Sequence, residues 1–261
     1  MRELFYRMSQ ILVAILALLT FTHTLQANEL KVVYAQGYLP FSWSDEDGQA
    51  QGAEIDFINE IIKKRMGIKV SHHVYPWARA QSMVKKGSAD AFVTIPNAKR
   101  RQYTVVSDIP FFSSNFLMHI GSSNSKISQL KKIGSMAQLL TYQDIIHGHI
   151  VGGGWHKLNL KSARLVQKAS NSLQILEMLH RNRIDVYIEQ APLIRYQMKV
   201  LGFEGRIVEL PQVMDETQWH ICISKESDYV KIMPGLNQLL KKMKNDDSLA
   251  QLQKKIFSQY Q

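Results

Sequence analysis

The chain has 261 residues, of which 45% are hydrophobic, and a formal net charge of +10 at pH 7. This length suffices for one large core or for two lobes of about 100 residues each. Basic residues are dispersed and do not interleave with aromatics, so we expect no nucleic-acid partner. The positive charge either suits anionic ligands or an anionic membrane face, or is simply a solvated surface.

The N-terminal segment has the composition of a secretory signal peptide. Arg2 and Arg7 give it a basic start, and residues 11–19 form an apolar stretch that is too short to span a bilayer comfortably. The small residue Ala27 precedes the polar Asn28. We therefore predict cleavage after Ala27 and export of the mature protein. The alternative is an uncleaved membrane anchor.

Strands and helices alternate through the first third of the remaining chain. The hydrophobic periodicity predicts strands over 29–35, 68–74 and 89–95, separated by helices over 52–65 and between Pro76 and Gly87. Such alternation is typical of a parallel sheet flanked by helices, which indicates an α/β fold.

A loop rich in glycine, proline and aromatic residues follows the first predicted strand. It contains Tyr38, Phe41 and Trp43. The end of a strand is where an α/β sheet presents its ligand contacts. We therefore expect some of these rings to contact a ligand, while others belong to the core.

Trp77 and Arg100 flank one predicted helix–strand unit. Pro76 can open the helix, and Pro96 ends the buried strand shortly before Arg100. Both side chains are thus expected near one edge of the unit. A flat aromatic ring and a guanidinium that face one crevice can hold a small ligand bearing a carboxylate.

The rest of the chain continues the alternation. Further strands are predicted over 103–107, 111–120, 149–151, 184–188 and 219–223, and helices over 129–142, 171–181, 192–200 and 234–261. The single cysteine, Cys222, lies in the last of these strands, and we interpret it as a small buried residue and not as a nucleophile.

The segment 83–93 has an internal repeat at 178–188. Asp90 corresponds to Asp185, and Gly87 corresponds to Asn182, two residue types that tolerate the left-handed conformation. Each segment reads as a helix, a left-handed cap, an aspartate and a buried strand. The repeat predicts two similar α/β lobes with a ligand crevice between them.

Few residues offer catalytic or metal chemistry. The motifs GxSxG, HExxH and CxxC are absent from the sequence. His147 and His149 would share one strand face, but no third metal ligand can be placed, so we expect no metal and no other cofactor. Glu189, at a predicted strand end, is the one candidate for a general base. The alternative is that Glu189 is a charge at the rim of the crevice or a ligand contact without a catalytic role.

The sequence resembles the family 3 extracytoplasmic solute-binding proteins, the periplasmic receptors of polar amino-acid ABC transporters. The resemblance covers residues 30–258, and the matching segments are Tyr38–Phe41, Asp47-Gly48, Gly52–Asp56, Gly87–Asp90, Arg100, Ser107–Phe111 and Arg183–Asp185. It implies a type II periplasmic binding protein with two α/β lobes and two hinge strands, near 112–120 and 212–223. The first lobe would combine 28–114 with 219–261, and the second lobe would be 115–218.

The resemblance also implies roles for single residues. Aromatic rings at Tyr38 and Trp77 would stack on the ligand, and Arg100 would pair with its carboxylate. Arg100 is preferred over Arg101 because it keeps the family spacing to Ser107.

Further ligand contacts are implied in both lobes. Thr94 would offer a hydroxyl, and the backbone N–H groups of Gly153 and Gly154, in a glycine-rich turn, would assist in binding an anion. The acid that pairs with the ligand ammonium in the family falls on Gln190, a neutral amide. Glu189 lies next to it but on the opposite face of the strand. Either the strand end is bulged, or the ligand lacks an ammonium group.

These features predict a monomeric periplasmic binding protein without catalytic residues. It would capture a small solute bearing a carboxylate, an amino acid or a related organic acid, and present it to an ABC permease in the inner membrane. One alternative is a ligand-sensing or orphan module without a permease. Another is an enzyme similar to the dehydratases of this fold, with Glu189 and Arg100 at its centre.

Overall fold

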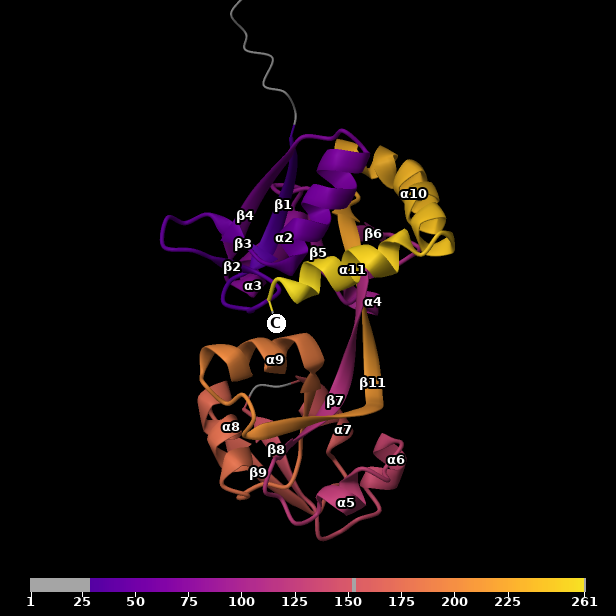
Figure 1. Cartoon of the computed structure of the whole chain (residues 1–261). Helices are drawn as coiled ribbons and strands as arrows, with labels where there is room; N and C mark the ends of the chain where they lie inside the picture. The colour runs from indigo at the N-terminus through magenta and orange to yellow at the C-terminus, as the bar shows by residue number, and fades with distance from the viewer. Residues whose placement is uncertain (1–28, 152–153, 261) are drawn as a thin grey trace, which may run out of the picture.

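The computed structural model describes residues 29–151 and 154–260. The predicted signal peptide and Gly153 lie outside the described residues. The chain forms two lobes joined by two long strands, β7 (Phe112–Gly121) and β11 (Ile207–Ser224) (Figure 1). This is the predicted two-lobed α/β fold.

The first lobe is built on a mixed sheet. Strand β1 (Leu30–Ala35) runs parallel to both β4 (Val70–Tyr75) and β5 (Ala91–Thr94). The C-terminal part of β11 pairs antiparallel with β5 and with β6 (Thr104–Val106). Because the central strands are covered on both faces, they read as almost continuous apolar runs.

Helices cover this sheet from both ends of the sequence (Figure 1). They are α2 (Ala53–Ile58), the π-helix η1 (Asn59–Arg65), α3 (Trp77–Lys85), α4 (Ala98–Arg101), the 3-10 helix η2 (Asp228–Ile232), α10 (Met233–Asn245) and α11 (Ser248–Ser258). The C-terminal helices pack into the same apolar core as α2. The single helix predicted over 52–65 is therefore an α-helix that continues as a π-helix. A short ribbon of β2 (Trp43–Ser44) and β3 (Ala50–Gln51) completes the lobe.

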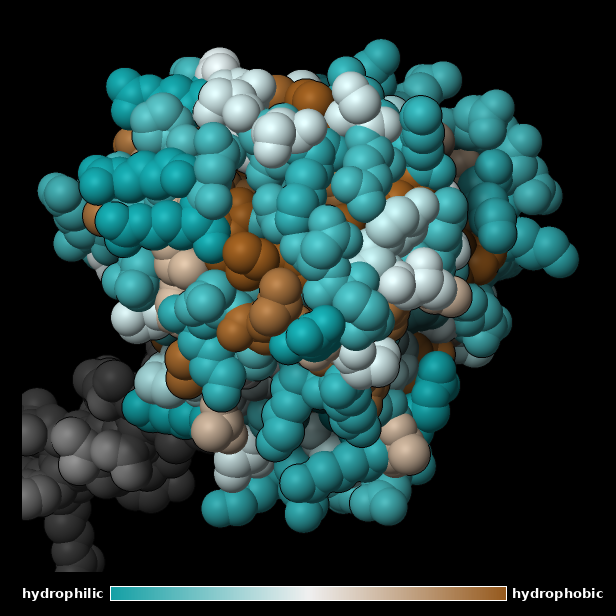
Figure 2. Space-filling model, turned by 90° about the horizontal axis from the view of Figure 1, so that it is seen from below, coloured by the Kyte–Doolittle hydropathy of each residue, from teal (hydrophilic) through white to brown (hydrophobic). Residues whose placement is uncertain are grey.

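The second lobe holds the other ends of the two long strands. Strand β10 (Tyr187–Gln190) pairs antiparallel with β7, and β8 (Ile146–Ile150) pairs in parallel with β9 (Leu165–Ala169). The helices of this lobe are α5 (Ile127–Leu130), α6 (Met136–Leu139), α7 (Gly154–Asn159), α8 (Ser172–His180) and α9 (Ala191–Val200). Figure 2 shows the lobe from below as a mainly hydrophilic face with a small central hydrophobic strip.

In the second lobe, two predictions were wrong in detail and one strand was missed. The helix predicted over 129–142 is two short helices, because the exposed Lys131 and Lys132 and then Gly134 interrupt the apolar pattern. Strand β9 was not predicted, since its side chains are mostly exposed and give no clear alternation. Strand β10 starts later than the predicted strand over 184–188.

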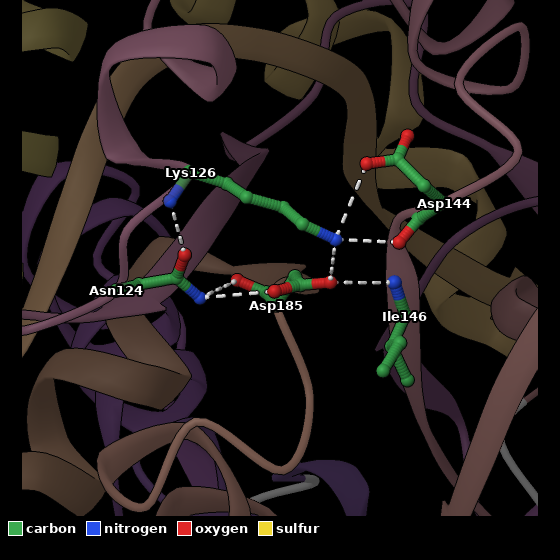
Figure 3. A network of polar contacts seen from close by, with 5 residues as sticks. All are labelled: Asn124, Lys126, Asp144, Ile146 and Asp185. Carbon is green, nitrogen blue, oxygen red and sulfur yellow. Dashed lines mark hydrogen bonds and ion pairs between the residues drawn. The ribbon is translucent and has the colours of Figure 1, made fainter.

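A buried carboxylate lies just before β10. Asp185 Oδ2 accepts hydrogen bonds from the backbone N–H of Ile146 and from Lys126 Nζ, both at 2.9 Å, and Asn124 Nδ2 donates to Oδ1 at 3.2 Å (Figure 3). Lys126 Nζ also lies 3.4 Å from Asp144 Oδ2. The Asp185 side chain thus anchors the beginning of β8, and the backbone of Asp185 and Val186 also bonds to β8, since both N–H groups donate to the carbonyl of Ile146.

The two strands that cross between the lobes are paired along most of their length. Phe112 lies opposite Trp219 at one end, and Gly121 lies opposite Ile207 at the other. The register shifts between Glu209 and Asp215, a stretch that contains Pro211, which has no N–H to donate to the ladder. Within residues 29–151 and 154–260, no helix has the length and apolar character needed to span a bilayer.

Candidate ligand-binding cleft

A cavity of about 380 Å³ opens on the first lobe where its strands end. Its walls include Tyr38, Glu54, Trp77, Thr94, Arg100 and Trp219. The cavity combines aromatic faces, one guanidinium, one carboxyl group and the hydroxyl groups of Tyr38 and Thr94. Four of the predicted ligand contacts, those at Tyr38, Trp77, Thr94 and Arg100, therefore lie together around one hollow.

Trp77 and Arg100 contact each other directly. Trp77 is the first residue of α3, and Arg100 lies in α4, which begins after Asn97, whose side chain accepts the Arg100 N–H at 2.9 Å. The Arg100 Cζ lies 5.2 Å from the centroid of the Trp77 ring, a distance typical of a cation–π contact.

Two further hydrogen bonds fix the guanidinium. Nη1 of Arg100 donates to the carbonyl of Ile95 at 2.6 Å, and Nε donates to Oε1 of Gln81 at 3.4 Å. Burial lowers the pKa of Arg100, but an arginine stays protonated at any physiological pH. A guanidinium has five N–H donors, so this one keeps donors for a carboxylate in the cavity.

Tyr38 is supported from behind by a stack of aromatic rings. Its ring lies 5.0 Å from that of Phe41 at an interplanar angle of 22°, and Phe41 stacks on Trp219 at 5.3 Å. Phe41 is fully buried and does not line the cavity. Phe41 therefore packs behind Tyr38 as a support, and the ligand contact expected of it remains a prediction.

Glu54 is a cavity residue to which sequence reasoning gave no role. It lies in the first turn of α2 and is only 2% exposed. Burial raises the pKa of Glu54 to about 8, so this carboxyl group is largely protonated at neutral pH. A carboxyl residue between the apolar Ala53 and Ile55 at a helix start is the signal that could have drawn attention to it.

A second cavity, of about 260 Å³, lies between the two lobes. Gly37, Tyr38 and Leu39 line it from the first lobe, and residues of the second lobe that include His156, Tyr187, Glu189 and Gln197 line it from the other side. Gly37 and Tyr38 line both cavities, so the two hollows meet at these residues.

Glu189 is a half-buried carboxyl group at the end of β10. Its Oε1 accepts the backbone N–H of Gln190 at 2.9 Å, and its Oε2 accepts the hydroxyl of Tyr187 at 3.1 Å. Burial raises the pKa of Glu189 to about 6, and these two hydrogen bonds oppose the shift. The group is therefore mainly ionised at neutral pH.

His156 forms one wall of the second cavity. Its ring stacks between those of His149, at 5.3 Å, and Tyr187, at 5.1 Å. Burial lowers the pKa of His156 to about 4, so the ring is neutral, and Nε2 donates to the carbonyl of Ile188 at 2.8 Å.

Gln190 connects the lobes. Its Nε2 donates to the Tyr38 hydroxyl at 2.8 Å, and its side chain is almost completely buried. The backbone of Gln190 pairs regularly with Phe116, so the end of β10 is not bulged there. Glu189 and Gln190 consequently point to different surroundings, as expected for neighbours on a strand.

The other predicted site residues are placed as follows. Thr94 is 5% exposed at the end of β5, within the first cavity. Gly154 is the first residue of α7, and Gly153 lies outside the described residues, so the glycine-rich turn remains a prediction. In the described part of the chain, no group of three or more His, Cys, Asp or Glu side chains is arranged to hold a metal ion, and this includes His147 and His149.

Two lobes joined by a pair of crossing strands, with cavities at and between their facing edges, define a type II periplasmic binding protein. The family model of the bacterial extracellular solute-binding proteins, family 3, matches residues 30–259, and the chain belongs to this family. Comparison with curated protein sequences returns no significant match.

Solved structures share the fold at low sequence identity. The substrate-binding domain 2 of Lactococcus lactis GlnP, in its open conformation, has a TM-score of 0.66 and 19% identity, and the match covers 91% of this chain and 97% of that domain. The unliganded, open L-cystine receptor of Neisseria gonorrhoeae has a TM-score of 0.66 and 14% identity, with 88% and 92% covered.

A third similar structure is a reconstructed ancestral amino-acid-binding protein, described as a precursor of cyclohexadienyl dehydratase. It has a TM-score of 0.61 and 21% identity, and the match covers 91% of this chain and 99% of the ancestral protein. At these identities the likeness shows the fold and not the ligand.

Proposed function

We propose that this protein is a periplasmic binding protein that captures a small solute bearing a carboxylate, an amino acid or a related organic acid, for ABC-type uptake. The observation that carries the proposal is the guanidinium of Arg100, which lies over Trp77 inside a cavity. Only two of its N–H donors are used by Ile95 and Gln81, so others can donate to a ligand. Such a group in a partly desolvated site recognises a planar anion by paired hydrogen bonds.

The proposed binding mode uses the walls of the first cavity. The ligand carboxylate pairs with Arg100 and accepts the hydroxyl of Thr94, while Tyr38 and Trp77 cover the apolar part of the solute. Backbone N–H groups of Gly153 and Gly154 would complete the anion site from the second lobe.

Closure of the lobes would complete capture. We propose that 28–114 with 219–261 moves as one body against 115–218, and that the flexing segments lie where β7 and β11 pass between the lobes. Closure excludes water from the cleft and so strengthens the interaction of Arg100 with the carboxylate.

The proposed location and partner follow from the same function. Cleavage after Ala27 would release a monomeric protein into the periplasm, where it would present its solute to an ABC permease. A module that senses the solute and feeds no permease would use the same cleft. Deletion of the gene distinguishes the two, since only the transport role predicts slower uptake of the labelled solute.

Turnover by a dehydratase is the second candidate function. Glu54, a carboxyl group that is largely protonated at neutral pH, lines the same cavity as Arg100, and a dehydratase needs an acid beside its bound substrate. We favour binding without turnover because the chain belongs to a family of solute-binding proteins. Incubation of the pure protein with a prephenate-like substrate tests this point, because formation of an aromatic product would contradict a pure binding role.

A thermal-shift screen with matched pairs tests the proposed function. Each carboxylate is compared with its primary amide, over amino acids, keto acids and dicarboxylates. A ligand at 100 times its dissociation constant stabilises the protein by ~2.7 kcal/mol. We expect at least one acid to raise Tm while its amide does not, and equal effects for acid and amide throughout would contradict the proposal.

A further inference from the structure

The first cavity contains a buried carboxyl group, that of Glu54. This residue lies in the first turn of α2, is 2% exposed and lines the cavity. Among residues 29–151 and 154–260, its side chain forms neither an ion pair nor a hydrogen bond. The cavity is therefore the place where this carboxyl group can find a partner.

Burial keeps the Glu54 carboxyl group neutral. A buried carboxylate without a counter-charge is unfavourable, and the pKa of Glu54 is accordingly raised to about 8. The positive end of α2 favours ionisation only weakly in comparison with burial.

The surroundings of Glu54 do not reverse this effect. The titratable groups that face it are the hydroxyls of Tyr34 on β1 and of Tyr38 on the following loop, and both are neutral because burial also raises their pKa. Arg100 lines the same cavity from α4 but lies beyond ion-pair distance of Glu54. Glu54 therefore reaches the cavity as a carboxylic acid.

A carboxylic acid can donate a hydrogen bond through its O–H, which a carboxylate cannot. A solute that fills the cavity excludes water from Glu54, and the O–H is then left unpaired unless the solute supplies an acceptor. Glu54 thus favours solutes with an acceptor in addition to the carboxylate that Arg100 would bind.

The charges of the cavity indicate that this second acceptor is neutral. Among the described residues that line the cavity, Arg100 is the one cationic side chain, so a second carboxylate on the solute would have no counter-charge. A ligand ammonium group would likewise meet no ionised acid there. A carbonyl oxygen accepts a hydrogen bond without carrying charge, and the volume of about 380 Å³ is in the usual range for small-molecule sites.

We propose that Glu54 determines the specificity of the first cavity by donating a hydrogen bond to a carbonyl oxygen of the solute, so that the protein prefers oxo acids. This inference rests on the proposed function and narrows its solute from amino acids and related organic acids to carboxylates that also bear a ketone oxygen. Glu54 acts here through binding alone, and no covalent bond is made or broken.

Matched ligands test the inference by isothermal titration calorimetry on the purified protein. 4-Methyl-2-oxopentanoate is compared with 4-methylpentanoate, and phenylpyruvate is compared with 3-phenylpropanoate, so that the members of each pair differ only by the ketone oxygen. We expect the oxo acid of at least one pair to bind about 5-fold or more tightly than its partner, the usual worth of one hydrogen bond. L-Leucine, with an ammonium group in place of the ketone oxygen, should bind more weakly than 4-methyl-2-oxopentanoate.

The pH dependence and two variants assign the preference to Glu54. The preference should shrink as the pH rises through about 8, because Glu54 then loses the proton that it donates. Glu54→Met keeps an unbranched side chain of similar length without a donor, and it should abolish the preference. Glu54→Gln supplies an N–H donor that does not titrate, so the dependence of the preference on pH should disappear.

Asp56→Asn is the matched control. Asp56 lies in the same helix, and burial raises the pKa of its carboxyl group as well. It accepts the hydroxyl of Tyr260 at 2.6 Å and lines a different hollow, against α11. This variant should therefore keep both the preference and its dependence on pH.

The outcomes separate the inference from the proposed function. Equal affinity of the wild-type protein within both pairs overturns the inference, as does tighter binding of L-leucine, a preference that grows with pH, or one that survives in Glu54→Met. Loss of the preference in Asp56→Asn also overturns it. A protein that binds other carboxylates but no member of either pair overturns the inference while the proposed function stands, and a protein that binds no carboxylate overturns both.

Discussion

The hydroxyl of Tyr38 accepts a hydrogen bond of 2.8 Å from the side-chain amide of Gln190, a residue 152 positions further along the chain. This bond joins the lobes at the point where the two cavities meet. Gln190 is 4% exposed, and its Oε1 has no partner within the described structure, so the bond with Tyr38 is the side-chain contact that offsets its burial.

Removal of this bond should weaken the contact between the lobes. We expect Tyr38→Phe to keep the aromatic stack on Phe41 and to destabilise the protein by about 1 kcal/mol, the usual net value of a hydrogen bond. A double-mutant cycle with Gln190→Ala, measured by urea unfolding, isolates the interaction. Strictly additive effects of the two substitutions would show that the bond does not contribute to stability.

Arg100 should be essential for affinity, whereas its neighbour Arg101 should not. Arg101 is exposed and lines neither cavity, so Arg101→Ala is a matched control in the same helix. Once a carboxylate ligand is found, Arg100→Ala should cost roughly 2–5 kcal/mol of binding free energy, the range for a truncated charge pair that is buried. Calorimetry measures the loss, and wild-type affinity in Arg100→Ala would refute the proposed carboxylate contact.

Glu54 should make the stability of the protein depend on pH. Its pKa is raised from the usual 4.5 to about 8, so folding favours the protonated form. The stabilisation is complete below pH 4.5 and is lost as the pH rises through 8. Glu54→Gln mimics the protonated group and should therefore gain stability relative to wild type, by up to a few kcal/mol, between pH 5 and pH 9.

The measurement is Tm as a function of pH for both proteins. The difference between them isolates Glu54, because the other titrating groups are shared. A difference that stays constant across this range would mean that Glu54 titrates normally and that its carboxyl group is better solvated than its 2% exposure indicates.

The sequence predicted the features that depend on local patterns. Gly87 and Asn182 adopt positive φ angles of 70° and 52°, and each precedes an aspartate that accepts a backbone N–H at a neighbouring parallel strand. Asp90 accepts from Lys31 at 2.7 Å, in the same way that Asp185 accepts from Ile146. A helix, a left-handed cap and an aspartate form a short-range motif, so its two copies are recognisable in the sequence.

Features set by tertiary packing were not predictable in this way. Glu54 shares its cavity with Tyr38, from a separate loop, and the support that Phe41 gives to Tyr38 depends on Trp219, far along the chain. Tyr38 lies between the two cavities, and its hydroxyl is held there by a hydrogen bond from Gln190 of the other lobe. For Glu189, the sequence indicated a strand end but not which of two cavities the carboxylate would face.

Asp185 offers a test of the network that anchors β8. Asp185→Ala removes the side-chain acceptor for the Ile146 N–H, for Lys126 Nζ and for the Asn124 amide, although Lys126 keeps its contacts with Asp144 and the Asn124 amide keeps the Asp185 carbonyl. We expect a loss of roughly 2–4 kcal/mol in the free energy of unfolding.

The matched control is Asp144→Ala. Asp144 contacts the same lysine, but its side chain is 64% exposed, so its removal should cost less than about 0.5 kcal/mol. Urea unfolding of both variants gives the comparison. Similar losses for Asp144→Ala and Asp185→Ala would show that Asp185 stabilises the fold through its ion pair with Lys126 and not through its bond to the Ile146 backbone.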